Sequence, residues 1–305
     1  MAIDQNINFS ASATDIPFLL LPETDSLFLN RALRLRNLAP GHAMEAYLRF
    51  MAGVANAQHH AMASISQTGR PTAVPGQPPL AIGSVERDPA WQQVLRQIAD
   101  EVSGMAPEGF STRLQHLLST ASSSDLESWA QAYLDGDFTG SDIGIMPLVA
   151  ASLQVYWAAL TRQLQDVPVE ARHAGHPSRL CPVCSSPPAG SITHAGAASQ
   201  GLRYLVCSLC SSQWNMERIR CVSCGDSRQV SYYGIEGTAG SIQAEACDAC
   251  HVYTKIMHME KDPALEILAD DLATLSLDIL VGEAGYQRYG LNPLLLTEPE
   301  LAAAE

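Results

Sequence analysis

The chain has 305 residues, of which 47% are hydrophobic and 16% charged, a composition that excludes a wholly disordered protein. Its formal net charge of -14 repels phosphate groups and argues against bulk electrostatic binding to nucleic acid or to anionic lipid. The length is comfortable for two domains.

Residues 1–165 are expected to form an all-α domain. From His42 onward the apolar residues recur at helical spacing and predict one amphipathic helix: Met44, Tyr47, Leu48, Met51, Val54 and Ala55. Asp88-Pro89 is typical of an N-cap followed by proline at the first helical position. Ser124 with Glu127 fits a capping box that would open another helix.

A long uncharged run, residues 143–161, belongs to a segment that we interpret as the last and most buried helix of this domain, residues 143–164. Its length approaches that of a membrane span, but Pro147, Gln154 and several alanines favour a helix inside a large bundle. The first ten residues lack the basic segment and apolar run of a secretory signal. We therefore expect a cytoplasmic protein that does not insert into a membrane.

The composition changes after a boundary segment, residues 166–180, which contains Pro168, Gly175 and Pro177. Short β-prone pieces follow, at residues 202–206 and 230–233, among cysteine pairs and turns. The last segment, residues 262–305, starts with an N-cap signature at Asp262-Pro263. It is expected to form one helix whose apolar face packs back on the rest: Ala264, Leu268, Leu272, Leu275 and Ile279.

All 8 cysteines fall in four C-x-x-C pairs: Cys181/Cys184, Cys207/Cys210, Cys221/Cys224 and Cys247/Cys250. The first two pairs map onto the last two by a shift of 40 residues, which makes an internal repeat. The repeat predicts two tandem metal modules, residues 181–220 and 221–261, each with one four-cysteine site. A cross-braced arrangement, with the first pair joined to the third and the second to the fourth, would use the same residues.

The chemistry of the pairs explains their spacing. Two residues between cysteines allow a tight turn, here called a knuckle, to direct both thiolates at one ion, and two knuckles complete a tetrahedral set. Such a set suits zinc or mononuclear iron, so two metal ions are expected per chain. A module of about 40 residues buries too little apolar surface to fold alone, and the metal supplies the missing stability. Structural disulfides are disfavoured in a reducing compartment.

Other candidate residues have simpler explanations than catalysis. His251 follows Cys250 and is interpreted as a surface group or a group beside the metal ligands, and His59-His60 as surface groups. Asp270-Asp271 is interpreted as a solvated helix face. Trp214 and Tyr204 are expected to pack between the metal sites. The sequence contains none of the P-loop, dinucleotide-binding, nucleophile-elbow or HExxH motifs, so no catalytic or cofactor-binding residue is predicted beyond the metal ligands.

The cysteine region resembles a known family. The stretch SQGLRYLVCSLCSSQWNMERIRCVSC, preceded by CPVC and followed by EACDACHVYTKI, is similar to the FdhE family of formate dehydrogenase accessory proteins. The likeness continues through EKDPALEILADDLATLSLDILVGEAGYQRYGLNPLLL, with weaker echoes in RALRLRNLA and YLRFMAGVANAQ.

The resemblance implies a maturation factor and not an enzyme. Members of the family are needed to assemble respiratory formate dehydrogenases and act in the cytoplasm on the catalytic subunit before its export. Their cysteine pairs are described as rubredoxin-like iron sites, which favours iron over zinc here. Carried over by position, the ligands are all eight cysteines. Ser185 and His251 stand where relatives often have glycine, which bears on the identity and tuning of the metal.

Two rival functions remain open at this level. A rubredoxin-type electron carrier or thiol oxidoreductase would need reversible iron reduction or dithiol turnover. A zinc-ribbon nucleic-acid binder would need a basic face on residues 177–262, which carry 7 basic and 7 acidic side chains. Arg218, Arg220 and Arg228 could still cluster there.

Overall fold

The computed structural model describes residues 16–65, 74, 76–106, 109–139, 141–165, 179–195 and 201–295. The predicted linker, residues 166–180, lies almost entirely outside these ranges. Within them, the N-terminal half contains α-helices at α1 (Thr24–Leu38), α2 (Glu45–Ser64), α3 (Ala90–Val102), α4 (Phe110–Thr120), α5 (Ser123–Asp135) and α6 (Met146–Arg162), with a short 3-10 helix at Ser103–Met105.

The C-terminal half is built around one sheet. Its strands are β2 (Pro188–Thr193), β3 (Arg203–Cys207), β4 (Gln213–Asn215), β5 (Val230–Tyr233), β6 (Ile242–Cys247), β7 (Val252–His258) and β8 (Gln287–Arg288), with β1 (Leu19–Leu20) from the N-terminal half. Two short helices follow β7, namely α7 (Ile267–Leu272) and α8 (Leu275–Glu283). The helices and the sheet with its knuckles confirm the predicted fold class.

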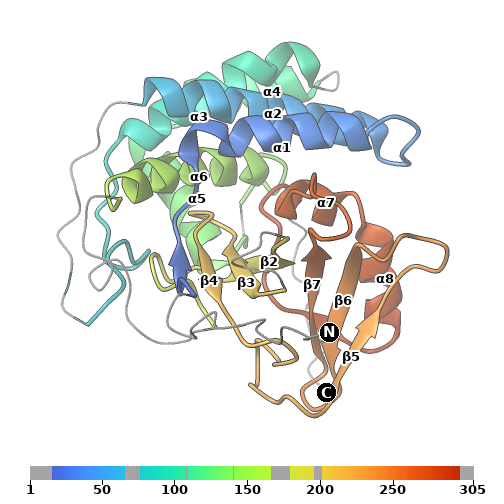
Figure 1. Cartoon of the computed structure of the whole chain (residues 1–305). Helices are drawn as coiled ribbons and strands as arrows, with labels where there is room; N and C mark the ends of the chain where they lie inside the picture. The colour runs from blue at the N-terminus through green and yellow to red at the C-terminus, as the bar shows by residue number, and fades with distance from the viewer. Residues whose placement is uncertain are drawn as a thin grey trace, which may run out of the picture.

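The two predicted modules lie side by side in this sheet. The strand order is β1-β4-β3-β2-β7-β6-β5, with β8 paired to β7, and Figure 1 shows β4, β3, β2, β7, β6 and β5 in this sequence across the molecule. Within each module the strands are antiparallel. The modules are joined by β2 and β7, which run parallel with Ser191 opposite Ile256. Each module thus extends the same sheet.

The hydrophobic core is divided unevenly between the modules. One large cluster of buried side chains contains Phe28 of α1, Trp91 of α3 and Trp157 of α6, and it continues without a break into the first module around Cys184. A second cluster lies between module two and α8, and its buried members are Ala244, Ala246, Tyr253, Leu277 and Val281. The first module is therefore part of the main core, whereas much of the second rests on a small core of its own.

The helix predictions succeed where periodicity is strong. The stripe from His42 lies on α2, and the uncharged run lies on α6, where nearly every residue is buried. The helix predicted to start at Asp88-Pro89 begins one residue later, because Pro89 is the N-cap of α3 and Asp88 accepts a hydrogen bond from the backbone N–H of Ala90 (2.8 Å). None of the described helices is long and apolar enough to cross a membrane.

The capping box of α5 lies two residues before the predicted one. The box consists of Ser122 and Asp125, whose side chains each accept from the other's backbone N–H. Glu127 bonds instead to the neighbouring helix segment, accepting from the indole N–H of Trp91 (2.6 Å) and from Arg87 (2.9 Å). The same spacing occurs twice in this serine-rich stretch, and tertiary contacts decide between the two.

The predicted single C-terminal helix is also wrong, because it is two helices. Asp262 caps only a turn, and α7 begins after Glu266, whose carboxylate accepts from two backbone N–H groups. Between α7 and α8, the buried Lys255 ammonium donates to the backbone carbonyls of Asp271 and Thr274. These carbonyls at the junction are satisfied by a side chain of β7. Ile279, expected on the buried face, is 62% exposed.

Asp270 and Asp271 do not form a solvated face: both are buried. Asp270 pairs with Arg34 of α1 (2.7 Å), while Asp271 pairs with Arg288 (2.8 Å) and Lys255 (3.2 Å). Burial raises the pKa of Asp270 despite its arginine partner. Burial acts in the same direction on Asp271, but its two cations hold the pKa of that carboxyl below its usual value. These acids connect α7 to the helical domain and to the sheet.

Candidate metal centres

The eight cysteines form two groups of four. Within each group the four Sγ atoms lie within 4.8 Å of one another. Site one comprises Cys181, Cys184, Cys207 and Cys210, and site two comprises Cys221, Cys224, Cys247 and Cys250. This is the tandem arrangement that the 40-residue repeat predicts, and not the cross-braced one.

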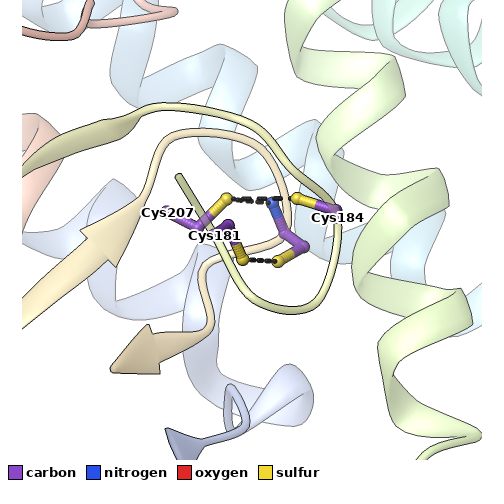
Figure 2. A group of neighbouring side chains, drawn as sticks. Cys181, Cys184 and Cys207 are labelled. Atoms are coloured by element: carbon purple, nitrogen blue, oxygen red, sulfur yellow. Dashed lines mark hydrogen bonds between the residues drawn. The ribbon is translucent and has the colours of Figure 1, made fainter. Parts of the chain in front are cut away.

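Sulfur spacing in site one fits a four-coordinate metal. The Sγ atoms of Cys181 and Cys210 are 3.6 Å apart, and those of Cys184 and Cys207 are 3.4 Å apart. Four thiolates about 2.3 Å from a central ion occupy a tetrahedron with edges of about 3.8 Å. A disulfide would require about 2.05 Å. Figure 2 shows the sulfurs of Cys181, Cys184 and Cys207 converging from two facing loops.

Site two has the same spacing. Its Sγ pairs are separated by 3.6 Å, from Cys221 to Cys250, and by 3.7 Å, from Cys224 to Cys247. The donor set and the distances therefore fit a tetrahedral metal equally well at both sites.

The backbone of each knuckle explains how the loops close. In all four knuckles the residue after the second cysteine adopts a left-handed conformation, with φ between 54° and 79°: Ser185, Ser211, Gly225 and His251. This turn lets backbone N–H groups point at sulfur, as Val183 does toward Cys181 (3.4 Å) and Leu209 toward Cys207 (3.4 Å). Serine and histidine occupy the glycine position at some conformational cost.

The surroundings of the two sites differ. All four cysteines of site one are buried, whereas Cys224 of site two is exposed and Cys250 is half-buried. Burial raises the pKa of the Cys181 and Cys207 thiols well above the usual value. At Cys224 a hydrogen bond from the backbone of Asp226 lowers the thiol pKa. Site one is enclosed by protein, and site two opens to solvent.

The helical domain encloses site one through backbone contacts. The N–H groups of Leu80 and Ile82 donate to the carbonyls of Val183 and Cys184, each at 2.9 Å. On the other knuckle, the Gln154 amide of α6 donates to the carbonyl of Ser208 (2.7 Å). One knuckle is thus fixed to the segment between α2 and α3 and the other to α6, so the site joins the two halves of the chain.

The remaining residues singled out from the sequence fall into simple roles. Trp214 and Tyr204 are fully buried on β4 and β3, where they pack in the main core. His251 is exposed beside site two, with its ring 5.9 Å from that of Tyr286. His60 is exposed and pairs with Glu101 (2.8 Å). His59 is only half-buried.

The arginines that a nucleic-acid binder would use have acidic neighbours. Arg220 pairs with Glu217 (3.0 Å) and Arg228 pairs with Asp226 (3.1 Å). The side chain of Arg218 acts electrostatically on Glu245 and Glu260. These contacts give no support to a basic face for nucleic acid.

A cleft of about 670 Å³ lies between α1 and the first module, and the sequence predicts none of its lining residues as members of a functional site. It extends from Leu33 of α1 to Ile192 of β2, and Ser211 brings it to the edge of site one. One signal was present in the sequence. Arg31 and Arg34 lie three residues apart in α1, and they pair with Glu266 and Asp270, which lie four apart. These two ion pairs join α1 to α7 and to Glu266, which precedes it, beside the cleft.

Comparison with known proteins gives matches to a single family along most of the chain. Models of the FdhE N-terminal, central and C-terminal domains match residues 16–172, 180–218 and 219–295. The chain is 38% identical to the "Protein FdhE homolog" of Serratia proteamaculans over 293 residues, which cover 94% of this chain and 93% of that one. It is 36% identical to "Protein FdhE" of Escherichia coli K12, with 93% of each chain covered.

A solved structure is also similar. The crystal structure of the FdhE protein from Pseudomonas aeruginosa superposes with a TM-score of 0.80 at 33% identity, covering 93% of this chain and all of that one.

Proposed function

The chain belongs to the FdhE family, and from this premise we propose that it is a cytoplasmic accessory protein that binds the catalytic subunit of a respiratory formate dehydrogenase and is needed for its assembly. The role is that of a binding protein and not of an enzyme. The name of the family and the architecture of the chain support this proposal together.

The cleft between α1 and the first module is the observation that carries the docking part of the proposal. Just over half of its lining residues are apolar, Leu20, Leu27 and Met259 among them, and Leu33 on its rim is 47% exposed. Polar groups lie among them, including Arg34 and Glu23. An apolar groove with a few polar anchors is a common form of peptide-binding site. We infer that a segment of the immature subunit occupies it.

The cleft is held open by rigid contacts. Arg31 of α1 is fully buried and donates to Glu266 (3.0 Å) and to Gln154 of α6 (3.2 Å). Gln154 in turn accepts from Gln58 of α2 (3.1 Å) and donates to the first module. Both walls are therefore fixed to one hydrogen-bonded network, which suits a preformed docking groove.

We further propose that the eight cysteines of sites one and two hold two metal ions. Iron would supply a one-electron couple, and zinc would supply structural stability alone. The modules at residues 181–220 and 221–261, together with the helical domain at 1–165 and the C-terminal segment at 262–305, form the proposed division of the chain.

Binding of the purified catalytic subunit to the immobilised chain tests this function. Leu33→Glu places a charge on the apolar rim of the cleft and should weaken binding at least ten-fold, as measured by biolayer interferometry. Ile279→Glu is the matched control, because Ile279 is also an exposed apolar residue on a helix but lies on α8, outside the cleft. Binding that neither variant alters would exclude the cleft, and no binding by the parent chain would exclude the accessory role.

A second function is favoured by one observation, the exposure of Cys224 at site two. A rubredoxin-type electron carrier needs a metal–thiolate site close to the surface. Iron-loaded protein should then be reduced and reoxidised reversibly in a voltammogram, and redox-silent metal in both sites would exclude this function.

A further inference from the structure

The two modules follow one another across the sheet in the same orientation. Each edge strand of one module therefore has an equivalent edge strand in the other. Strands β2, β3 and β4 of the first module correspond to β5, β6 and β7 of the second. Strand β2 therefore has the same position in its module as β5 has in the other. The edge of β2 that faces away from β3 pairs with β7 in parallel orientation. No described strand pairs with the equivalent edge of β5, which faces away from β6.

The backbone of β5 offers hydrogen-bonding groups at that edge. The N–H of Asp248 donates to the carbonyl of Gln229 (2.9 Å), so these two residues form a hydrogen-bonded pair. In an antiparallel ladder such pairs recur at every second residue, and the residues between them direct their backbone groups to the other side of the strand. Tyr232, opposite Glu245, therefore directs its backbone N–H and C=O away from β6. In the first module Ser191 occupies the corresponding place, and it lies opposite Ile256 of β7.

Strand β5 is short, but its residues include neither of the two types that most directly block pairing at an edge. Its sequence VSYY contains no charge and no proline, the residues that commonly block pairing with another chain. The side chains of Tyr232 and Tyr233 are 41% and 38% exposed. The ring of Tyr233 lies 5.6 Å from that of Tyr286, so an aromatic surface borders this edge.

The other end of the repeat shows why a second copy cannot add to β5 in the same head-to-tail way. In head-to-tail growth, β4 of another copy would cover β5, just as β7 covers β2 within one chain. Strand β1 already occupies the outer edge of β4, with Leu19 opposite Trp214 and Leu20 opposite Gln213. This closed end prevents open-ended assembly of identical chains.

We propose that the outer edge of β5 binds an extended segment of a partner protein, added as a parallel strand in the way that β7 is added to β2. We expect this segment to resemble β7 in sequence, with apolar residues at the positions that correspond to Ile256 and Met257, which lie opposite Ser191 and Ile192 of β2. This surface is separate from the cleft, none of whose lining residues lies on β5. The inference does not depend on the function proposed above.

Hydrogen–deuterium exchange on the full, metal-loaded chain tests the proposal, with the peptide VYTKIMHM as the probe. This peptide reproduces residues 252–259, which include β7. Saturating peptide should slow exchange in residues 230–234 at least ten-fold, and a fluorescein-labelled form should bind with rising anisotropy. Unchanged exchange in this segment would overturn the proposal.

Two variants make the result specific. Tyr232→Pro removes the outward N–H without removing a bond to β6, since proline is tolerated at such edge positions, and it should weaken peptide binding at least ten-fold. Tyr232→Phe keeps the backbone donor and removes only the hydroxyl that bonds to Glu245, so it should bind as the parent does. Metal content and the thermal unfolding midpoint verify that both variants fold.

Equal binding by the parent and by Tyr232→Pro would place the peptide elsewhere and contradict the proposal. Protection of residues 230–234 that needs no peptide and increases with protein concentration would identify a second copy as the occupant, which also contradicts it.

Discussion

Site one and site two each contain four cysteine sulfurs at similar spacing, yet site one lies inside the protein and site two lies at its surface. Site one shares the main hydrophobic core, and both of its knuckles bond to the helical domain through Val183, Cys184 and Ser208. Site two has its exposed ligand Cys224 and lies in a module with a small separate core. Two sites with similar ligand geometry can therefore differ in solvent access and in their contribution to stability, because the surrounding residues determine both.

The largest contrast is expected when one ligand is removed from each site. Cys184→Ser leaves a broken site inside the core and should lower the free energy of unfolding by more than about 4 kcal/mol, or prevent folding. Cys224→Ser alters an exposed ligand and should cost about 1–2 kcal/mol. Urea unfolding of the metal-loaded chains measures both.

A reversed order of stability, or equal losses, would show that site one does not join the two halves. Leu33→Glu provides a control for general surface damage and should leave the urea midpoint almost unchanged, because its side chain is on the rim of the cleft.

Alkylation should distinguish the sites by rate. Iodoacetamide needs access to the sulfur, so Cys224 should be the first cysteine modified in the native chain, at least ten-fold faster than any ligand of site one. Peptide mapping by mass spectrometry at successive times measures the order. Early modification of Cys181 or Cys184 would indicate that site one opens readily.

The smallest changes in stability are expected from substitutions of the residue that follows the second cysteine of a knuckle and has a left-handed backbone conformation. Ser185→Gly relieves backbone strain at site one and should raise stability by about 0.5–1 kcal/mol. Gly225→Ala at site two introduces the same strain and should lower stability by about 1 kcal/mol. A Cβ at residue 225 would meet its nearest neighbour, the Arg220 side chain, only at 3.7 Å, so no clash adds to this cost.

Differential scanning calorimetry of the metal-loaded variants measures both changes. Shifts of the same sign would mean that the conformation of this residue does not limit either site.

Local patterns made much of this structure predictable. The 40-residue repeat of the cysteine pairs indicated which four cysteines come together, and the apolar spacing from His42 identified α2. Strand β5 was also predicted from its β-prone residues, at Val230–Tyr233. In each of these cases, residues close in sequence or related by a fixed interval carry the signal.

Contacts between distant residues were not predictable in the same way. The parallel pairing of β2 with β7 joins segments about sixty residues apart, and the sequence of neither strand specifies its partner. The sequence pattern predicts a solvated face at Asp270 and Asp271, and this prediction is wrong because the cations that neutralise them lie elsewhere in the chain, at Arg34, Lys255 and Arg288. The cleft depends on such contacts, so the residues that line it are identified only by the structure.

Metal release to a chelator tests the central contrast most directly. The chain, loaded with two equivalents of zinc, is mixed with excess 4-(2-pyridylazo)resorcinol, and the absorbance of the zinc complex is followed with time. The account predicts two phases of one equivalent each, with the fast phase at least ten-fold faster and absent from Cys224→Ser. A single phase that releases both equivalents together, in the parent chain, would contradict the difference between an enclosed and an open site.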